Sequence, residues 1–106
     1  MSYCIVNCTT SNKKNATEIA KTLIESKLAA CVNIIPHVIS IYTWENNICE
    51  GEEFLMVIKT QKKLFKKVES VILEKHEYEI PEIIATSIEK GNDKYLKWIK
   101  TETKGC

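Results

Sequence analysis

Apolar runs and amphipathic stretches alternate from the first residues of the chain onward. Residues 3–9 form a short apolar run that is typical of a buried strand, and the polar residues 10–12 supply N-cap oxygens. Residues 12–27 then place apolar side chains three and four positions apart, which predicts an amphipathic helix. A second apolar strand follows over residues 29–35, and Pro36 interrupts it with a bend or bulge. The apolar stripe of the helix comprises Ala16, Ile19, Ala20, Leu23, Ile24 and Leu28.

A long hairpin is predicted in the middle of the chain. Residues 38–44 are rich in Ile, Tyr, Thr and Trp, and residues 48–60 return with an apolar half at 54–58. Residues 45–47 make the turn, because Asn tolerates a left-handed backbone. Each arm exceeds ten residues, so at about 3.3 Å per residue the hairpin is longer than a small domain. Part of it should therefore project and need another surface to cover it.

The last third of the chain predicts helix, strand and helix. Thr60 is expected to cap a second amphipathic helix over residues 61–74, and residues 76–82 form a polar connector. Residues 83–88 predict a fourth strand, and a turn at 91–93 leads into a short last helix. The order β-α-β-β-α-β with a C-terminal helix predicts a ferredoxin-like α+β sandwich.

We expect one domain over residues 1–106 that forms a homo-oligomer. Two short helices cover one face of the predicted sheet. The hairpin supplies more apolar surface than these helices can cover, so a second copy of the chain is expected on the other face. This surplus consists of Val38, Ile39, Ile41, Tyr42 and residues 54–58.

The amino-acid composition argues against several classes of function. The 106 residues carry a net charge of +1, which argues against a strongly basic nucleic-acid surface. All 15 basic residues are lysine, which makes arginine-based phosphate recognition unavailable, and no glycine-rich phosphate loop occurs. The longest wholly apolar run, residues 28–32, is too short to span a bilayer. Five cysteines without a CxxC pair, and the lack of a visible secretory signal, predict free thiols in the cytoplasm.

The densest polar cluster lies at residues 75–82, which hold a histidine, three glutamates and a tyrosine. Strands one and four of a ferredoxin-like sheet are neighbours, so Cys8 and His76 should lie at the same end of it. Such a pair is consistent with a divalent metal site or with a thiolate nucleophile. It is equally consistent with a core cysteine beside a solvated histidine, because no HxxH, HExxH or paired CxxC motif is present.

Several motifs in order resemble the CutA family, whose name denotes divalent-cation tolerance. The run KLAACVNIIP at residues 27–36 is the first, and SIYTWE at 40–45 and IKT at 58–60 follow. The pattern HxYExPEII begins at His76, and Gly91 precedes YLxWI at residues 95–99. Together these motifs cover nearly the whole chain.

The resemblance implies a tight homotrimer of ferredoxin-like subunits that binds copper(II) or another divalent cation and is not an enzyme. Cys8 and His76 match residues that serve as proposed metal ligands in bacterial members. The family has two adjacent histidines at this place. His76 matches one of them and Lys75 stands at the position of the other, where a protonated lysine cannot ligate a metal. Glu77 replaces the proline that usually follows and adds a carboxylate.

The resemblance also implies a pocket at the boundary between subunits. The family's trimers look like PII-type signalling trimers, so the alternative is a non-enzymatic sensor that holds a small anionic ligand through Lys59 and backbone amides. Trp44 and Tyr42 would either stack on a ligand or fill a contact between subunits. The pocket residues implied by the resemblance are Trp44, Glu53, Lys59, His76, Tyr78 and Glu79.

Overall fold

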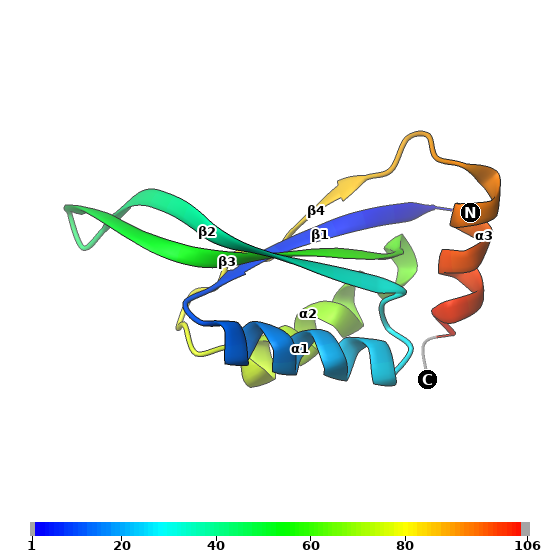
Figure 1. Cartoon of the computed structure of the whole chain (residues 1–106), viewed down its shortest axis with the longest axis horizontal. Coiled ribbons are helices and arrows are strands. Elements are labelled where there is room, and N and C mark those ends of the chain that lie inside the picture. Colours follow the sequence, from blue (N-terminus) through cyan, green and yellow to red (C-terminus); the bar gives the residue numbers. More distant parts are fainter. Residues whose placement is uncertain (1, 105–106) are drawn as a thin grey trace.

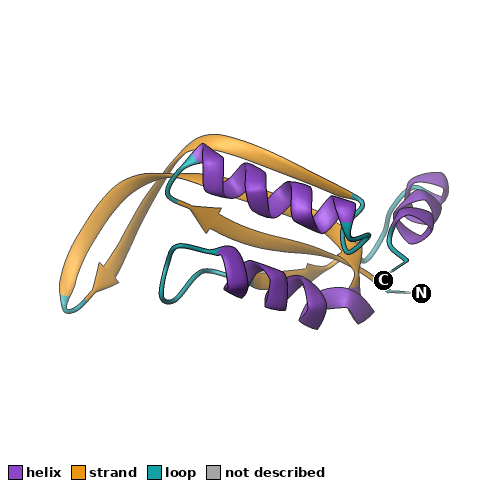
Figure 2. Cartoon of the chain, turned by 90° about the horizontal axis from the view of Figure 1, so that it is seen from below, coloured by secondary structure: helices purple, strands orange, loops and turns teal. Residues whose placement is uncertain are grey.

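Two helices lie against one face of a four-stranded antiparallel sheet, as Figures 1 and 2 show. The structure is a computed structural model that describes residues 2–104. It confirms the predicted ferredoxin-like α+β sandwich. The elements are β1 (Tyr3–Thr10), α1 (Lys13–Glu25), β2 (Cys31–Trp44), β3 (Asn47–Gln61), a 3-10 turn (Lys62–Leu64), α2 (Phe65–Lys75), β4 (Ile84–Ser87) and α3 (Asp93–Glu102).

The sheet has the strand order β2-β3-β1-β4, and every neighbouring pair is antiparallel. The split βαβ arrangement places β1 between β3 and β4, as the element order requires. β4 is short and pairs only with residues 4–7 of β1. Residues 8–10 at the C-terminal end of β1 therefore have no strand partner on this edge within the described chain. The segment that connects α2 to β4 passes beside them.

The hairpin of β2 and β3 extends well past β1 and gives the molecule a longest dimension of 44 Å (Figure 1). The predicted irregularity lies at Pro36 and His37, which both oppose Phe54, and His37 adopts a φ of 62°. The turn is tighter than predicted. Asn47 pairs with Trp44, so only Glu45 and Asn46 form the loop, both with positive φ as a two-residue turn of this type requires.

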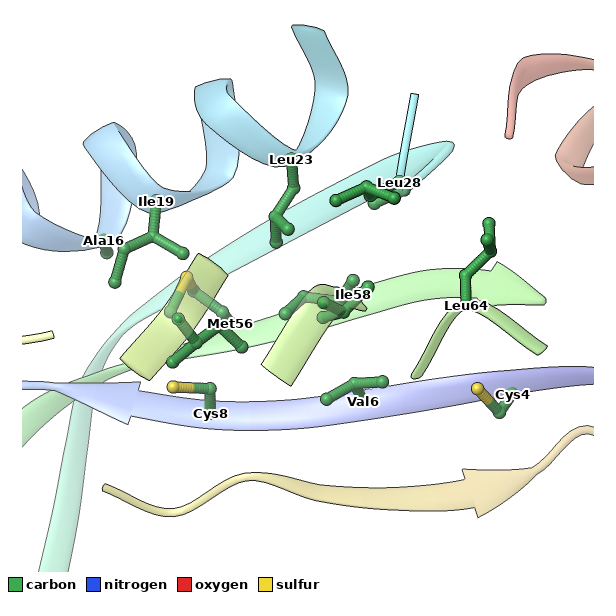
Figure 3. Close-up of a cluster of buried hydrophobic side chains, with 13 residues drawn as sticks. Cys4, Val6, Cys8, Ala16, Ile19, Leu23, Leu28, Met56, Ile58 and Leu64 are labelled. Atoms are coloured by element: carbon green, nitrogen blue, oxygen red, sulfur yellow. The ribbon is translucent and has the colours of Figure 1, made fainter. Parts of the chain in front are cut away.

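The core lies between the sheet and α1 and α2 (Figure 3). Alternate residues of β1, namely Cys4, Val6 and Cys8, point toward the helices, because successive strand side chains face opposite sides. The buried stripe of α1 matches the predicted one, except that Ile24 is partly exposed. The fully buried side chains of this core include Ile19, Leu23, Met56, Ile58, Val68 and Ile72.

The two main helices begin differently. The side chain of Asn12 accepts a hydrogen bond from the Asn15 amide at 2.7 Å, which confirms the predicted cap of α1. The predicted cap of the second helix at Thr60 is wrong. The Thr60 hydroxyl instead donates to the Leu28 carbonyl at 2.6 Å, and the chain enters α2 through a 3-10 turn.

The face of the sheet opposite α1 and α2 is rich in exposed apolar side chains. On β2, Ile35 is 46% exposed and pairs with Leu55, the neighbour of the helix-facing Met56, so it lies on the face turned away from the helices. Ile84 continues this surface on β4.

The projecting Ile39 and Ile41 are 65% and 68% exposed. They pair with Glu52 and Glu50, which have the parity of the helix-facing residues of β3. Helix α3 lies at the far end of the sheet, beyond the two layers (Figure 1). Within residues 2–104, no helix combines the length and apolarity needed to cross a membrane.

Candidate functional site

A cavity of about 660 Å³ lies where the projecting hairpin passes the segment between α2 and β4. The hairpin forms one wall, the end of β1 forms the floor, and residues 78–82 form the opposite wall. Four residues predicted for a pocket therefore share this cavity: Trp44, Glu53, Tyr78 and Glu79. The remaining lining residues are Thr9, Ser40, Ile41, Tyr42, Ile80, Pro81 and Glu82.

His76 fixes the wall formed by residues 78–82. Its Nε2 lies 2.7 Å from the Thr9 carbonyl oxygen, and its Nδ1 accepts a hydrogen bond from the Tyr78 amide at 3.0 Å. A carbonyl oxygen can only accept and a backbone amide can only donate, so these contacts select the neutral tautomer with the proton on Nε2. His76 thus ties the segment to β1.

Two further contacts hold the same wall. The Glu77 carboxylate accepts a hydrogen bond from the side-chain amide Nδ2 of Asn12 at 2.9 Å. The side chain of Asn15 donates to the Lys75 carbonyl at 3.0 Å. Both partners belong to the start of α1. The carboxylate that Glu77 adds at this position is therefore used to anchor the segment, and it does not line the cavity.

Tyr78 connects the wall to the hairpin. Its hydroxyl donates to Glu53 Oε2 at 2.6 Å, within the short range expected for a bond to a carboxylate. Burial, followed by the neighbouring Glu53 carboxylate, raises the pKa of Tyr78 above its ordinary value of 10.0. The phenol consequently stays protonated and keeps donating to Glu53 across the neutral pH range.

Cys8 lies beneath this site with its side chain fully buried. Its thiol points toward the Thr9 carbonyl oxygen, at 3.9 Å, which is the same atom that His76 contacts. The structure thus brings Cys8 and His76 together, as the strand order predicts. Burial, and then the charges of Glu82 and Glu53, raise the pKa of the Cys8 thiol from 9.0 to about 12.

Cys8 and His76 would each have to change before they could bind a metal ion. Burial raises the pKa of the Cys8 thiol, so a metal would have to displace its proton to bind the thiolate. Both ring nitrogens of His76 already have hydrogen-bond partners, so ligation requires the loss of one of them. Among residues 2–104, no group of three or more His, Cys, Asp and Glu side chains is placed to hold a metal. The role of Cys8 and His76 as ligands stays a prediction.

Lys59 is not part of the cavity within one chain. It lies on β3 six residues beyond Glu53, which corresponds to about 20 Å along a strand. Its ammonium group contacts Asn33 Oδ1 on the neighbouring strand. Three glutamates, and no lysine among the described residues, line the cavity of one chain.

Comparison with known proteins identifies the family. Residues 4–102 match the family model of the CutA1 divalent ion tolerance protein. The chain belongs to this family. It is 45% identical over 103 residues to the Protein CutA of Homo sapiens, covering 97% of this chain and 56% of the human protein. It is 40% identical to the divalent-cation tolerance protein CutA of Thermus thermophilus, covering 93% of this chain and 96% of that protein.

The CutA1 fold is confirmed by solved structures. The crystal structure of CutA1 from Oryza sativa superposes with a TM-score of 0.96 at 39% identity, and the match covers 100% of this chain and 97% of the rice chain. The chain spans 55–57% of the length of the first curated CutA relatives, from Arabidopsis, human, mouse and rice. The family names denote tolerance proteins rather than a known enzyme.

The prediction of a cytoplasmic protein is wrong. CutA relatives from Arabidopsis thaliana and Oryza sativa are named as chloroplastic, and the Archaeoglobus fulgidus CutA, at 37% identity, is named as periplasmic. The prediction rested on five cysteines without a CxxC pair and on the lack of a visible secretory signal. They do not determine where a member of this family resides.

Proposed function

We propose that this chain is a divalent-cation tolerance protein that binds divalent metal ions, with copper(II) as the first ion to test. The observation that carries this proposal is the family match over residues 4–102. The Thermus thermophilus relative supports it, because the match covers 96% of that protein and its name is divalent-cation tolerance protein CutA. No finding favours the PII-like alternative, a sensor of a small anionic ligand at the subunit interface.

We further propose that the protein acts as a homotrimer. The apolar face opposite α1 and α2 supports a covering subunit, since Ile35 and Ile84 on it are 46% and 54% exposed. The projecting hairpin adds Ile39 and Ile41, which are 65% and 68% exposed. We expect light scattering after size-exclusion chromatography to give about three times the 12.2 kDa chain mass. A particle of single-chain mass that persists at micromolar concentration would contradict the proposal.

Titration calorimetry with copper(II) tests the ion and its ligands together. If Cys8 and His76 are the ligands, the double variant Cys8→Ser, His76→Ala loses copper binding. We expect the wild-type affinity at this site to be weak, because ligation must displace a thiol proton and a histidine hydrogen bond.

The chain offers matched controls for that titration. Cys49 and His37 lie on the hairpin and outside the cavity, so the variant Cys49→Ser, His37→Ala should bind copper(II) as the wild type does. Equal copper affinity in the wild type and the Cys8, His76 variant would refute the ligand assignment while leaving the family function in place. If neither copper(II) nor any other divalent ion binds the wild type, the proposed function fails.

A further inference from the structure

A second cleft, of about 400 Å³, lies between α3 and the 3-10 turn that leads into α2. It is at the end of the sheet away from the hairpin turn, as the position of α3 in Figure 1 shows. Among residues 2–104, every charged side chain that lines this cleft is a lysine. Such a lining attracts anions. The lysines are Lys63, Lys97, Lys100 and Lys104.

The positive charge of the cleft is concentrated there by the sequence and is not balanced by acidic neighbours. Residues 61–67 carry four lysines and no acidic residue, and residues 90–104 carry five lysines and two acidic residues. Glu102, one of these two, pairs with Lys27 at 3.3 Å. Within residues 2–104, none of the four lysines in the cleft forms an ion pair. Like charges that share a cleft repel one another, so a bound anion stabilises the folded protein.

Buried hydrogen bonds fix the floor of this cleft. Nε2 of Gln61, at the end of β3, donates to the carbonyl and hydroxyl oxygens of Thr103 at 3.0 and 2.8 Å. The Thr103 hydroxyl donates in turn to the Ile99 carbonyl at 2.6 Å. The side chains of Gln61 and Thr103 are both buried. These bonds attach the end of α3 to β3, and they hold the lysines of α3 opposite Lys63.

The lysines of α3 lie on a different flank of the helix from its exposed aromatic side chains, Tyr95 and Trp98. Tyr95 lies beside Cys31, so the aromatic flank is turned toward the start of β2. The lysine flank is turned toward the 3-10 turn. A subunit that covered α3 would bury the aromatic flank more cheaply, because the burial of unpaired lysines is costly. We therefore expect the cleft to stay open in a trimer.

The chemistry of the cleft favours a ligand with more than one phosphate group. Four lysines supply four positive charges, whereas a single phosphate group carries at most about two negative charges. Lysine binds phosphate as a point charge, so this recognition does not need arginine. No aromatic side chain lines the cleft within residues 2–104, so it offers no surface on which a nucleotide base could stack.

We propose that this cleft binds a small soluble oligophosphate, with pyrophosphate as the simplest case. The ammonium groups of Lys63 and of the α3 lysines contact the phosphate oxygens from opposite sides. The site differs from the PII-like alternative, because Lys59 does not line it. The inference is also independent of the proposed function, since neither Cys8 nor His76 takes part in it.

Isothermal titration calorimetry of the full chain with pyrophosphate tests this proposal. The buffer contains no phosphate and no divalent cation, and its salt concentration is about 0.15 M, which screens weak surface attraction. We expect saturable binding of one pyrophosphate per chain. Orthophosphate should bind about tenfold more weakly, because it carries fewer charges and reaches fewer lysines. Absence of saturable pyrophosphate binding, or equal affinity for the two anions, would overturn the proposal.

Paired variants locate the site. The double variant Lys63→Gln, Lys97→Gln should weaken pyrophosphate binding by about tenfold. The matched control Lys66→Gln, Lys94→Gln removes the same charge from lysines that lie three residues away and outside the cleft, and it should leave affinity within about twofold of the wild type. All four lysines are exposed, so both variants should fold. Equal loss of affinity in the two variants would mean that only net charge matters, and would overturn the proposal.

Discussion

Replacing Leu23 by alanine should lower the free energy of unfolding by about 2–5 kcal/mol. Leu23 is fully buried on α1, where its side chain points from the helix toward the sheet (Figure 3). Its removal loses the transfer free energy of the apolar atoms and leaves a cavity that the surrounding β3 and α2 side chains only partly fill. Urea unfolding, followed by circular dichroism at one fixed protein concentration, measures the change and separates it from any effect of assembly.

Leu73 on α2 provides the matched control, because the same substitution removes the same atoms from a side chain that is 54% exposed. Leu73→Ala should change stability by about 0.5 kcal/mol or less. If both variants lost equal stability, the described core between the sheet and the two helices would not be the main source of stability. A large loss in Leu73→Ala alone would place α2 in a contact between subunits.

The parts of the fold that the sequence predicts best are those governed by local periodicity. The stripe of α1 follows from a spacing of three to four residues, and the two long arms of the hairpin follow from runs of β-branched, aromatic and other apolar residues. Pro36 correctly indicates the irregularity in β2, since proline lacks the amide that a strand ladder needs. Each of these features depends on neighbours within one element.

Features that depend on distant partners were not predictable in the same way. Thr60 has the residue type of a helix cap, but its hydroxyl bonds Leu28, 32 residues earlier in the chain. Lys59 lies outside the cavity of one chain, and its place in a pocket between subunits stays a prediction.

The candidate site illustrates the same limit. Topology brings Cys8 and His76 to one carbonyl, as expected, because β1 and the segment before β4 meet at one end of the sheet. The occupation of both His76 nitrogens could not be predicted, since it depends on the backbone path of residues 76–78. The wall residues Ile80, Pro81 and Glu82 line the cavity without a recognisable motif, and only the structure identifies them.

Alkaline pH should destabilise the protein through Cys8, by up to about 4 kcal/mol between pH 9 and pH 12. Burial raises the pKa of this thiol from 9.0 to about 12, so the folded state holds the thiol proton more tightly than the unfolded state does. Below pH 9 both states keep the proton and stability does not change with pH through this group. Above pH 9 the unfolded chain loses its proton first, which favours unfolding by about 1.4 kcal/mol per pH unit.

Urea unfolding of the wild type and of Cys8→Ala, from about pH 8 to about pH 10.5, tests this expectation. Cys8→Ala is less stable at pH 8 because its smaller side chain leaves space in the core, but its stability should fall less steeply with pH than that of the wild type. Cys49→Ala, on the hairpin, should keep the wild-type slope. Tyr78 and Cys4, whose pKa values are also raised, contribute equally to all three proteins, so the difference in slope isolates Cys8. Parallel pH profiles for the wild type and Cys8→Ala would mean that the thiol ionises in the folded protein as readily as in the unfolded chain, and would reopen Cys8 as a thiolate ligand.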